Sequence, residues 1–203
     1  MSDWKDPIES MNDYISDIVT GEIVSCETVM GAINRHQRDL GDQNSDDFPY
    51  YFDVDHARNV LNFFPTLMRH SIGRDVGKPF TLLPWQCFAI GSLFGWKHRD
   101  TDARRFTKAF ISVARKSGKS TLAAAIAHFM AGFDRNPETG TFENVAQVVL
   151  AATKKEQATR VVFSEACRML RQSEVLSKMA EIKNHQITYA HNAGHIFCTG
   201  SDK

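Results

Sequence analysis

The residues whose chemistry is easiest to read lie in one run, Val113-Ala-Arg-Lys-Ser-Gly-Lys-Ser-Thr121. An apolar stretch at 109–114 overlaps its start, and an alanine-rich segment with apolar residues at helical spacing follows it as far as Gly132. A strand that passes through such a turn into a helix gathers unpaired backbone N–H groups and the positive end of the helix dipole, which attract phosphate. Lys119 would add a charge for the outer phosphates, and the Ser120 hydroxyl could bind Mg²⁺.

This run departs from the full phosphate-loop pattern. Gly-x-x-x-x-Gly-Lys-Ser/Thr requires glycine at position 113, where the chain has Val113. Gly-Lys-Ser alone is a weak signal, but the apolar stretch before it and the helical pattern after it strengthen it. We therefore predict a phosphate-binding loop, with an ordinary strand–turn–helix corner as the alternative.

The composition fits an α/β domain with a smaller appendage, because the chain has 203 residues. Lys plus Arg and Asp plus Glu each number 24, so binding of nucleic acid through overall charge is not indicated, although a local basic patch remains open. The four cysteines lack CxxC spacing and predict reduced thiols. No apolar run approaches the ~20 residues that span a bilayer, and no signal peptide is recognised. We expect a cytoplasmic protein without a membrane partner.

Periodicity before the loop predicts mainly helices. Residues 1–40 should form two, the first stopped by Gly21 and the second capped by Thr28. His36 and its polar neighbours are assigned to the exposed face of the second helix. A third helix should begin at Asp55, with its apolar residues on one side. These elements form a helical leader.

The segment after the loop predicts the α/β core. Residues 145–151 read as a second strand that is covered on both faces, and Thr153 should open a capping box with Glu156. Residues 186–190 and 194–199 should pair as a hairpin. This order of strands and helices predicts a three-layer α/β sheet with right-handed crossovers.

Two polar clusters have more than one interpretation. The first is basic and is either a solvated loop or a contact for phosphate or DNA; its members are Lys97, His98, Arg99, Arg104, Arg105 and Lys108. The second consists of histidines that could bind a metal but fit the rim of the hairpin better, namely His185, His191 and His195.

A family resemblance rests on four stretches, 82–86, 94–96, 113–120 and 151–158. In these the chain resembles the N-terminal part of the large terminase subunit, the DNA-packaging motor of tailed double-stranded-DNA bacteriophages. That family commonly has a degenerate phosphate loop with an arginine near its start and no first glycine, so Val113 fits the resemblance. The resemblance implies a P-loop NTPase fold of the ASCE (RecA-like) type.

The resemblance also implies roles for individual residues. Arg115 and Lys119 would be catalytic, with Arg115 acting on the γ-phosphate, and Gln86 would read the adenine of ATP. The phosphates and Mg²⁺ would be held by the loop and the first helical turn, that is by Arg115, Lys116, Ser117, Gly118, Lys119, Ser120 and Thr121, with Ser120 as the metal ligand. Arg115 could instead be a solvated turn residue or a contact for a partner subunit, and Gln86 an ordinary polar residue of a first helical turn.

Two features of the family are not recognised after Ser120. One is an apolar strand that ends in Asp-Glu, and the other is the carboxylate cluster of a C-terminal nuclease domain. We therefore expect a leader at 1–75 and a truncated ATPase core at 76–203, which binds ATP but hydrolyses it poorly. The full-length protein would be an ATPase with an endonuclease domain.

The partners implied by the resemblance are double-stranded DNA, the small terminase subunit and the portal. The resemblance also allows a homo-oligomeric ring in the cytoplasm of the bacterial host. The leader could be a lid or a contact for a small partner subunit. Two other functions remain open from the sequence. The chain could be a fragment of a helicase-like or repair ATPase, or a non-catalytic assembly module.

Overall fold

The computed structural model describes residues 5–152 and 159–200. By its packing the chain forms two units, and each unit is described by itself. The first comprises Met1–Asn62 and Thr81–Phe110, and the second comprises Phe63–Phe80 and Ile111–Lys203. The expected division of the chain near residue 75, into a leader and an ATPase core, stays a prediction.

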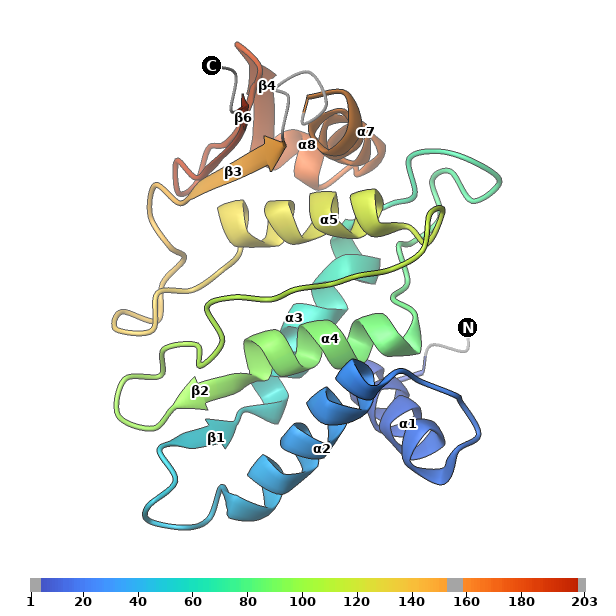
Figure 1. Ribbon diagram of the computed structural model, residues 1–203. Helices are drawn as coiled ribbons and strands as arrows, with labels where there is room; N and C mark the ends of the chain where they lie inside the picture. The colour runs from blue at the N-terminus through green and yellow to red at the C-terminus, as the bar shows by residue number, and fades with distance from the viewer. Residues whose placement is uncertain (1–4, 153–158, 201–203) are drawn as a thin grey trace. The chain divides into compact units, whose positions relative to one another are not determined.

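The first unit is mainly helical, as expected. Its elements are α1 (Pro7–Thr20), α2 (Glu27–Asp42), β1 (Tyr50–Phe52), most of α3 (Val54–Leu67), α4 (Pro84–Gly95) and β2 (Trp96–His98) (Figure 1). Helices α1 and α4 pack on each other, and β1 pairs with β2 in antiparallel fashion. Gly21 ends α1 with a left-handed φ of 83°, which glycine adopts without steric cost. The predicted stop of the first helix is thereby confirmed.

Two predicted helix starts are displaced. The N-cap of α2 is Cys26 rather than Thr28. Helix α3 begins at Val54, and the Oδ1 atom of Asp53 accepts a hydrogen bond from the backbone N–H of His56 at 2.8 Å. Asp53 therefore performs the capping that we expected of Asp55. Asp53 and Asp55 suit a cap equally, so only the path of the chain decides between them, whereas Cys26 caps α2 without a side-chain hydrogen bond.

The polar side of α2 is exposed as predicted at Arg35, Gln37 and Arg38, but the assignment to the surface is wrong for His36 and Asp39. His36 is 3% exposed and Asp39 is 2% exposed. Trp96 donates its indole N–H to His36 Nδ1 at 3.0 Å, and Arg105 donates to Asp39 Oδ2 at 2.7 Å. These partners lie 60 and 66 residues further along the chain. The helical pattern of α2 alone therefore gives no sign of them.

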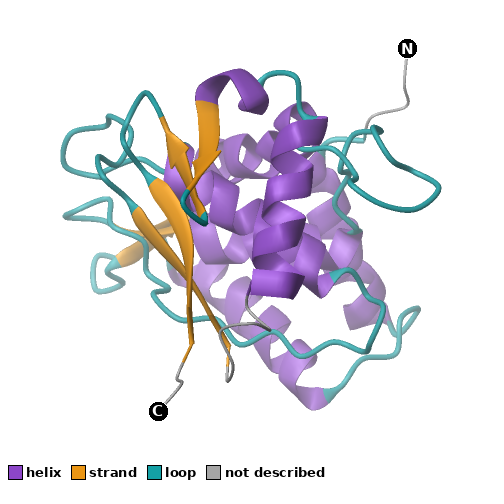
Figure 2. Ribbon diagram, turned by 90° about the horizontal axis from the view of Figure 1, so that it is seen from above, coloured by secondary structure: helices purple, strands orange, loops and turns teal. Residues whose placement is uncertain are grey.

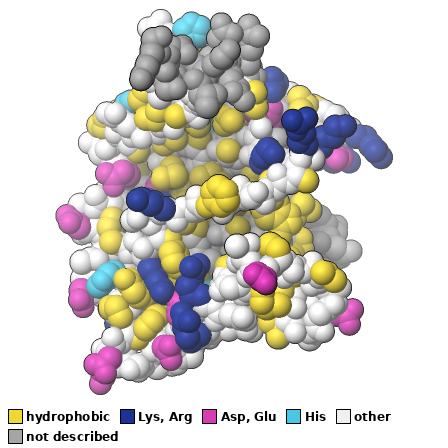
Figure 3. Space-filling view, in the orientation of Figure 1, with side chains coloured by type: hydrophobic (Ala, Val, Ile, Leu, Met, Phe, Trp, Pro, Cys, Tyr) yellow, Lys and Arg dark blue, Asp and Glu magenta, His cyan; other side chains and the backbone are white. Residues whose placement is uncertain are grey.

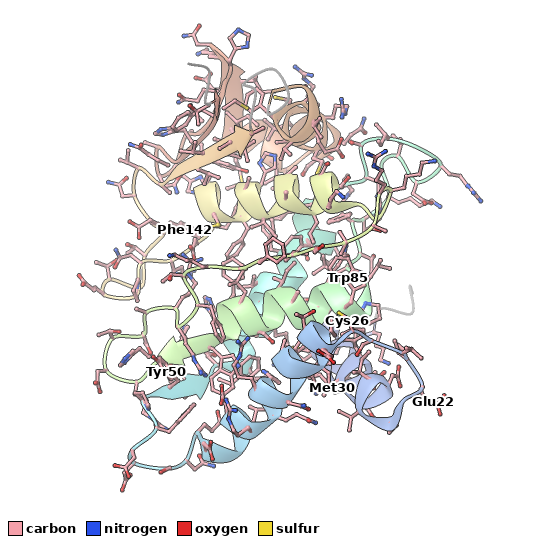
Figure 4. The ribbon with its side chains drawn as sticks, viewed as in Figure 1. Glu22, Cys26, Met30, Tyr50, Trp85 and Phe142 are labelled. Carbon is pink, nitrogen blue, oxygen red and sulfur yellow. The ribbon has the colours of Figure 1, made fainter. Side chains whose placement is uncertain are left out.

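The basic cluster joins elements of the first unit. Lys97 forms an ion pair with Asp53 at 2.9 Å, and the Arg105 guanidinium lies 4.3 Å from the ring centroid of Tyr50. Tyr50 is labelled on β1 in Figure 4. The side chains of Lys97 and Arg105 are only 14% and 15% exposed, so a solvated loop is the wrong description for both. Lys and Arg side chains gather over β1 and β2 (Figure 3). A role in contacting phosphate or DNA stays a prediction.

The second unit contains a β-sheet, whose strands are orange in Figure 2. The sheet has four strands in the order β3-β6-β5-β4. The elements of this unit after α5 (Lys119–Gly132) are β3 (Gln147–Ala152), η1 (Thr159–Phe163), α7 (Ser164–Gln172), α8 (Leu176–Met179), β4 (Ala180–Lys183), β5 (Gln186–Tyr189) and β6 (His195–Gly200). Strands β5 and β6 pair as the predicted hairpin, and β6 runs parallel to β3. Strand β4, which extends the sheet beyond β5, was not predicted.

Two predictions about strands are wrong. Residues 109–114 form no strand, and Phe110 is 94% exposed. An extended segment needs a neighbour for its backbone groups, and none of the described strands pairs with it. Strand β3 alternates exposed with half-buried residues instead of being covered on both faces. The predicted capping box of Thr153 and Glu156 lies outside the described residues.

A buried histidine connects α5 with the rest of the second unit. His128 is 0% exposed, and its ring nitrogens lie 2.7 Å from the Tyr189 hydroxyl and 2.9 Å from the Ala166 carbonyl oxygen. A carbonyl only accepts, so Nε2 carries the proton and Nδ1 accepts from Tyr189. Helix α5 is thereby joined to α7 and β5. Burial lowers the pKa of His128 to about 4.

The C-terminal end of α5 meets the turn between β5 and β6. His191 Nε2 lies 2.7 Å from the carbonyl oxygen of Gly132, and Asn192 donates its side-chain N–H to the carbonyl oxygen of Ala131 at 3.0 Å. Gly194 sits so close that an added Cβ would overlap the Ala131 carbonyl. These contacts supply partners for carbonyl groups that a helix leaves unpaired at its end.

The two buried histidines predict a pH-dependent stability. Burial lowers the pKa of His36, like that of His128, to about 4, whereas an unfolded histidine has a pKa of about 6.5. The unfolded chain therefore binds more protons between these values, and the free energy of unfolding falls as the pH drops from 6.5 towards 4. We expect a loss of roughly 2 kcal/mol per histidine at pH 5.

Urea denaturation at pH 7.5 and pH 5 measures this loss. The exposed His185 provides a control, because His185→Asn should leave the difference between the two pH values unchanged. Equal free energies of unfolding at both pH values would show that His36 and His128 titrate normally in the folded protein.

Candidate nucleotide-binding site

The predicted phosphate loop runs directly into α5 of the second unit (Figure 1). Lys116 and Gly118 both have left-handed backbones, with φ of 67° and 71°. Gly118 is the N-cap of α5, and its carbonyl accepts from the N–H of Leu122 at 2.9 Å. The N–H groups of the first helical turn have no partner within a helix, so the loop ends at a place that favours an anion.

Lys119 is the first residue of α5 and reaches back across the loop. Its exposed side chain donates from Nζ to the carbonyl oxygen of Val113 at 3.2 Å. Val113 occupies the position of the missing first glycine, and there it contributes a carbonyl acceptor to the lysine. A charged phosphate oxygen is a stronger acceptor than this neutral carbonyl and can replace it.

The structure brings together the predicted residues from Arg115 to Thr121. Arg115, Lys116 and Lys119 are exposed, whereas Ser117 and Ser120 are half-buried. Lys and Arg side chains gather over the loops near the N-terminal end of α5 (Figure 3). The positive charges and the helix dipole therefore act in the same sense and attract anions.

Gln86 belongs to the first unit and is described by its own contacts. It lies in the first turn of α4, is 3% exposed, and accepts the backbone N–H of Leu83 on Oε1 at 2.8 Å. The side chain therefore caps α4, which agrees with the plainer of the two interpretations. A carbonyl oxygen can accept a second hydrogen bond, so this contact does not conflict with a role in reading adenine.

A buried carboxylate stands behind the first turn of α5, and the sequence did not reveal it. Glu165 of α7 is 3% exposed. Its Oε1 accepts from the hydroxyls of Thr121 at 3.3 Å and Ser71 at 2.6 Å, and its Oε2 accepts from Arg168 at 2.7 Å. Thr121 and Ser71 lie 44 and 94 residues away in sequence. The sequence offered one sign of this site, because the i, i+3 spacing of Glu165 and Arg168 on one helix indicates an ion pair.

The metal interpretation of the hairpin histidines finds no support. Across residues 5–152 and 159–200, no group of three or more His, Cys, Asp or Glu side chains is placed to hold a metal ion. His191 instead approaches the end of α5. Within the same residues, no helix is both long enough and apolar enough to cross a membrane.

The comparison with protein families decides the relationship. The profile of "Terminase large subunit, ATPase domain" matches residues 84–203, which is more than half of the chain. The chain belongs to this family. The match includes Gln86 and the phosphate loop and begins after the expected leader. No curated protein matches the chain.

A solved structure agrees with this assignment. The large terminase of bacteriophage HK97 matches with a TM-score of 0.57 and 21% sequence identity. The match covers 72% of this chain and 28% of the HK97 protein. The terminase resemblance and the predicted P-loop fold of the ASCE type are thereby confirmed. The match therefore spans less than a third of the length of that terminase.

The left-handed backbone of Lys116 predicts the effect of a substitution. A side chain in this conformation is strained, so Lys116→Gly should be more stable than Lys116→Ala by roughly 0.5–1 kcal/mol. The alanine variant is the matched control, because both variants lose the ammonium group and only alanine keeps a Cβ. Urea denaturation of the two variants measures the difference. A less stable glycine variant would show that the loop does not hold residue 116 in this conformation.

Proposed function

We propose that this chain is the ATP-binding part of a viral DNA-packaging motor, in which ATP hydrolysis drives DNA into a procapsid. Membership in the terminase family supports this proposal. The observation that carries it is the position of Lys119, which opens α5 directly after the left-handed Gly118 and reaches across the loop. This is the arrangement that a triphosphate requires.

The residues of the loop fit ATP and Mg²⁺ in distinct roles. Backbone N–H groups at Lys116, Ser117 and Gly118 would face the phosphates, and Lys119 would transfer its hydrogen bond from a carbonyl to a phosphate oxygen. The Ser120 hydroxyl would bind Mg²⁺, which helps to neutralise the phosphates. Arg115 is exposed at the start of the turn, where its guanidinium would stabilise charge on the γ-phosphate during transfer.

These 203 residues alone would hydrolyse ATP slowly. Among the described carboxylates, Glu165 lies beside the first turn of α5, but it is paired with Arg168 and accepts from two hydroxyls. An acid engaged in this way is a poor base for water. The full-length protein would supply the remaining carboxylates and a nuclease activity.

The wider assembly belongs to the same proposal. Double-stranded DNA would be the substrate of translocation, and the small terminase subunit and the portal would be partners, within a homo-oligomeric ring in the host cytoplasm. Residues 1–75 would form a leader that acts as a lid or as a contact for a partner. Residues 76–203 would form the ATPase core.

Loss of the Lys119 ammonium should weaken nucleotide binding. A hydrogen bond between charged groups contributes about 1.5–3 kcal/mol, so Lys119→Ala should raise the Kd of Mg·ATP about 10–100-fold. Lys116→Ala is the control, because it removes a cation from the same loop without touching the helix start. We expect it to change the Kd much less. Isothermal titration calorimetry measures both values.

The wild-type chain provides the decisive result in this experiment. If it is folded and binds neither ATP nor ADP in the presence of Mg²⁺, the proposed function is wrong, and a non-catalytic assembly module becomes the better interpretation. Rapid steady-state hydrolysis by these residues would contradict the prediction of slow turnover.

Gln86→Glu separates the two roles of Gln86. The substitution keeps an oxygen to accept from Leu83 but removes the amide N–H₂, which only adenine recognition requires. We expect the preference for ATP over GTP to fall, measured as the ratio of the two Kd values, and the melting temperature to fall as well, because the new carboxylate is buried. Gln86→Ala is the comparison, because it also removes the cap and should cost about 1 kcal/mol of stability. An unchanged ratio in Gln86→Glu would exclude adenine recognition.

A further inference from the structure

Glu165 connects the start of α5 with a loop far away in sequence. This loop, residues 69–79, is closed on itself. The N–H of His70 donates to the Lys78 carbonyl at 3.0 Å, and the N–H of Gly77 donates to the His70 carbonyl at 2.9 Å. Ser71 lies at the base of the loop, is 9% exposed, and donates its hydroxyl to Glu165. The loop is therefore a compact structure fastened at one point to a buried carboxylate.

The two oxygens of Glu165 have separate tasks. Oε2 accepts from two nitrogens of Arg168, which compensates the charge of the buried carboxylate. Oε1 accepts from both Thr121 and Ser71. A single atom therefore holds the first turn of α5 and the 69–79 loop together. Because both hydroxyls share one acceptor, a shift of the first changes the geometry available to the second.

Thr121 places this connection next to the nucleotide site. It belongs to the first turn of α5, directly after Ser120 and two residues after Lys119. A ligand that binds to the N–H groups and the hydroxyl of this turn fixes its position, and Thr121 moves with the turn. Its 3.3 Å distance to Glu165 is long for a bond between a hydroxyl and a carboxylate, so the contact can tighten.

We propose that Glu165 is a positioning residue, which transmits occupancy of the phosphate loop to the 69–79 loop through Thr121 and Ser71. Nucleotide binding tightens the contact between Thr121 and Glu165, and the 69–79 loop becomes more rigid because Ser71 shares the same oxygen. This inference rests on the proposed nucleotide binding. It goes beyond nucleotide binding, because it assigns a response to the 69–79 loop, which contains none of the residues expected to bind ATP or Mg²⁺.

Hydrogen exchange of the 69–79 loop tests this connection. The amides of His70 and Gly77 are useful probes, because both are hydrogen-bonded within the loop. Exchange would be followed by mass spectrometry in the wild-type chain with and without saturating Mg·ADP. We expect exchange in this loop to slow several-fold when the nucleotide is bound.

Three variants separate transmission from a merely structural role. Thr121→Val removes the hydroxyl but keeps the shape, and it should abolish the change in exchange. Thr121→Ser restores the hydroxyl and should restore the change. Ser71→Ala should bind Mg·ADP with a Kd within about threefold of the wild type, yet its loop should not respond to the nucleotide. If Thr121→Val fails to fold, Ser71→Ala still decides the question.

The outcomes distinguish this inference from the proposed function. If the wild-type chain binds Mg·ADP and exchange at 69–79 does not change, the inference is wrong and the proposed function stands. A full response in Thr121→Val or in Ser71→Ala also overturns the inference. If the wild-type chain does not bind nucleotide at all, both are wrong.

Discussion

The fixed position of α5 is the constraint on which the second unit depends. A helix start presents its N–H groups to phosphate in the position that the fold gives it, and α5 has polar contacts near its start, its middle and its end. Thr121 contacts Glu165 at the start, His128 bridges α7 and β5 in the middle, and Asn192 meets the end. Each contact is a hydrogen bond between α5 and another segment of the unit. Hydrogen bonds require a particular geometry, so they define the orientation of the helix in addition to its apolar packing.

The first unit uses buried polar groups in a similar way. Asp39 would be costly to bury alone, and its ion pair with Arg105 makes burial possible. His36 accepts from Trp96 and stays neutral because its pKa is lowered. These two contacts fix α2 against β2 and the segment that follows it. Some cations of the basic cluster, such as Arg105, are therefore paired within the fold instead of being available for an external ligand.

Local patterns explain what the sequence could predict. The helices of the first unit, the turn at Gly21, the hairpin and the turn that leads into α5 follow from periodicity and from residues close together in the chain. The burial of His36 and the contact of Glu165 with Ser71 depend on partners far away in sequence, which no local pattern contains. The strand expected at 109–114 failed for the same reason, since apolar residues indicate a strand only where a neighbour pairs with it.

The turn between β5 and β6 ties the end of α5 to the sheet through a close approach of two backbones. Gly194 leaves no room for a Cβ against the Ala131 carbonyl, so any other residue at this position would push the turn away from the helix. The carbonyl groups of Ala131 and Gly132 would then lose the partners that Asn192 and His191 provide. A change in the sheet would thus disturb the helix at the end opposite the phosphate loop.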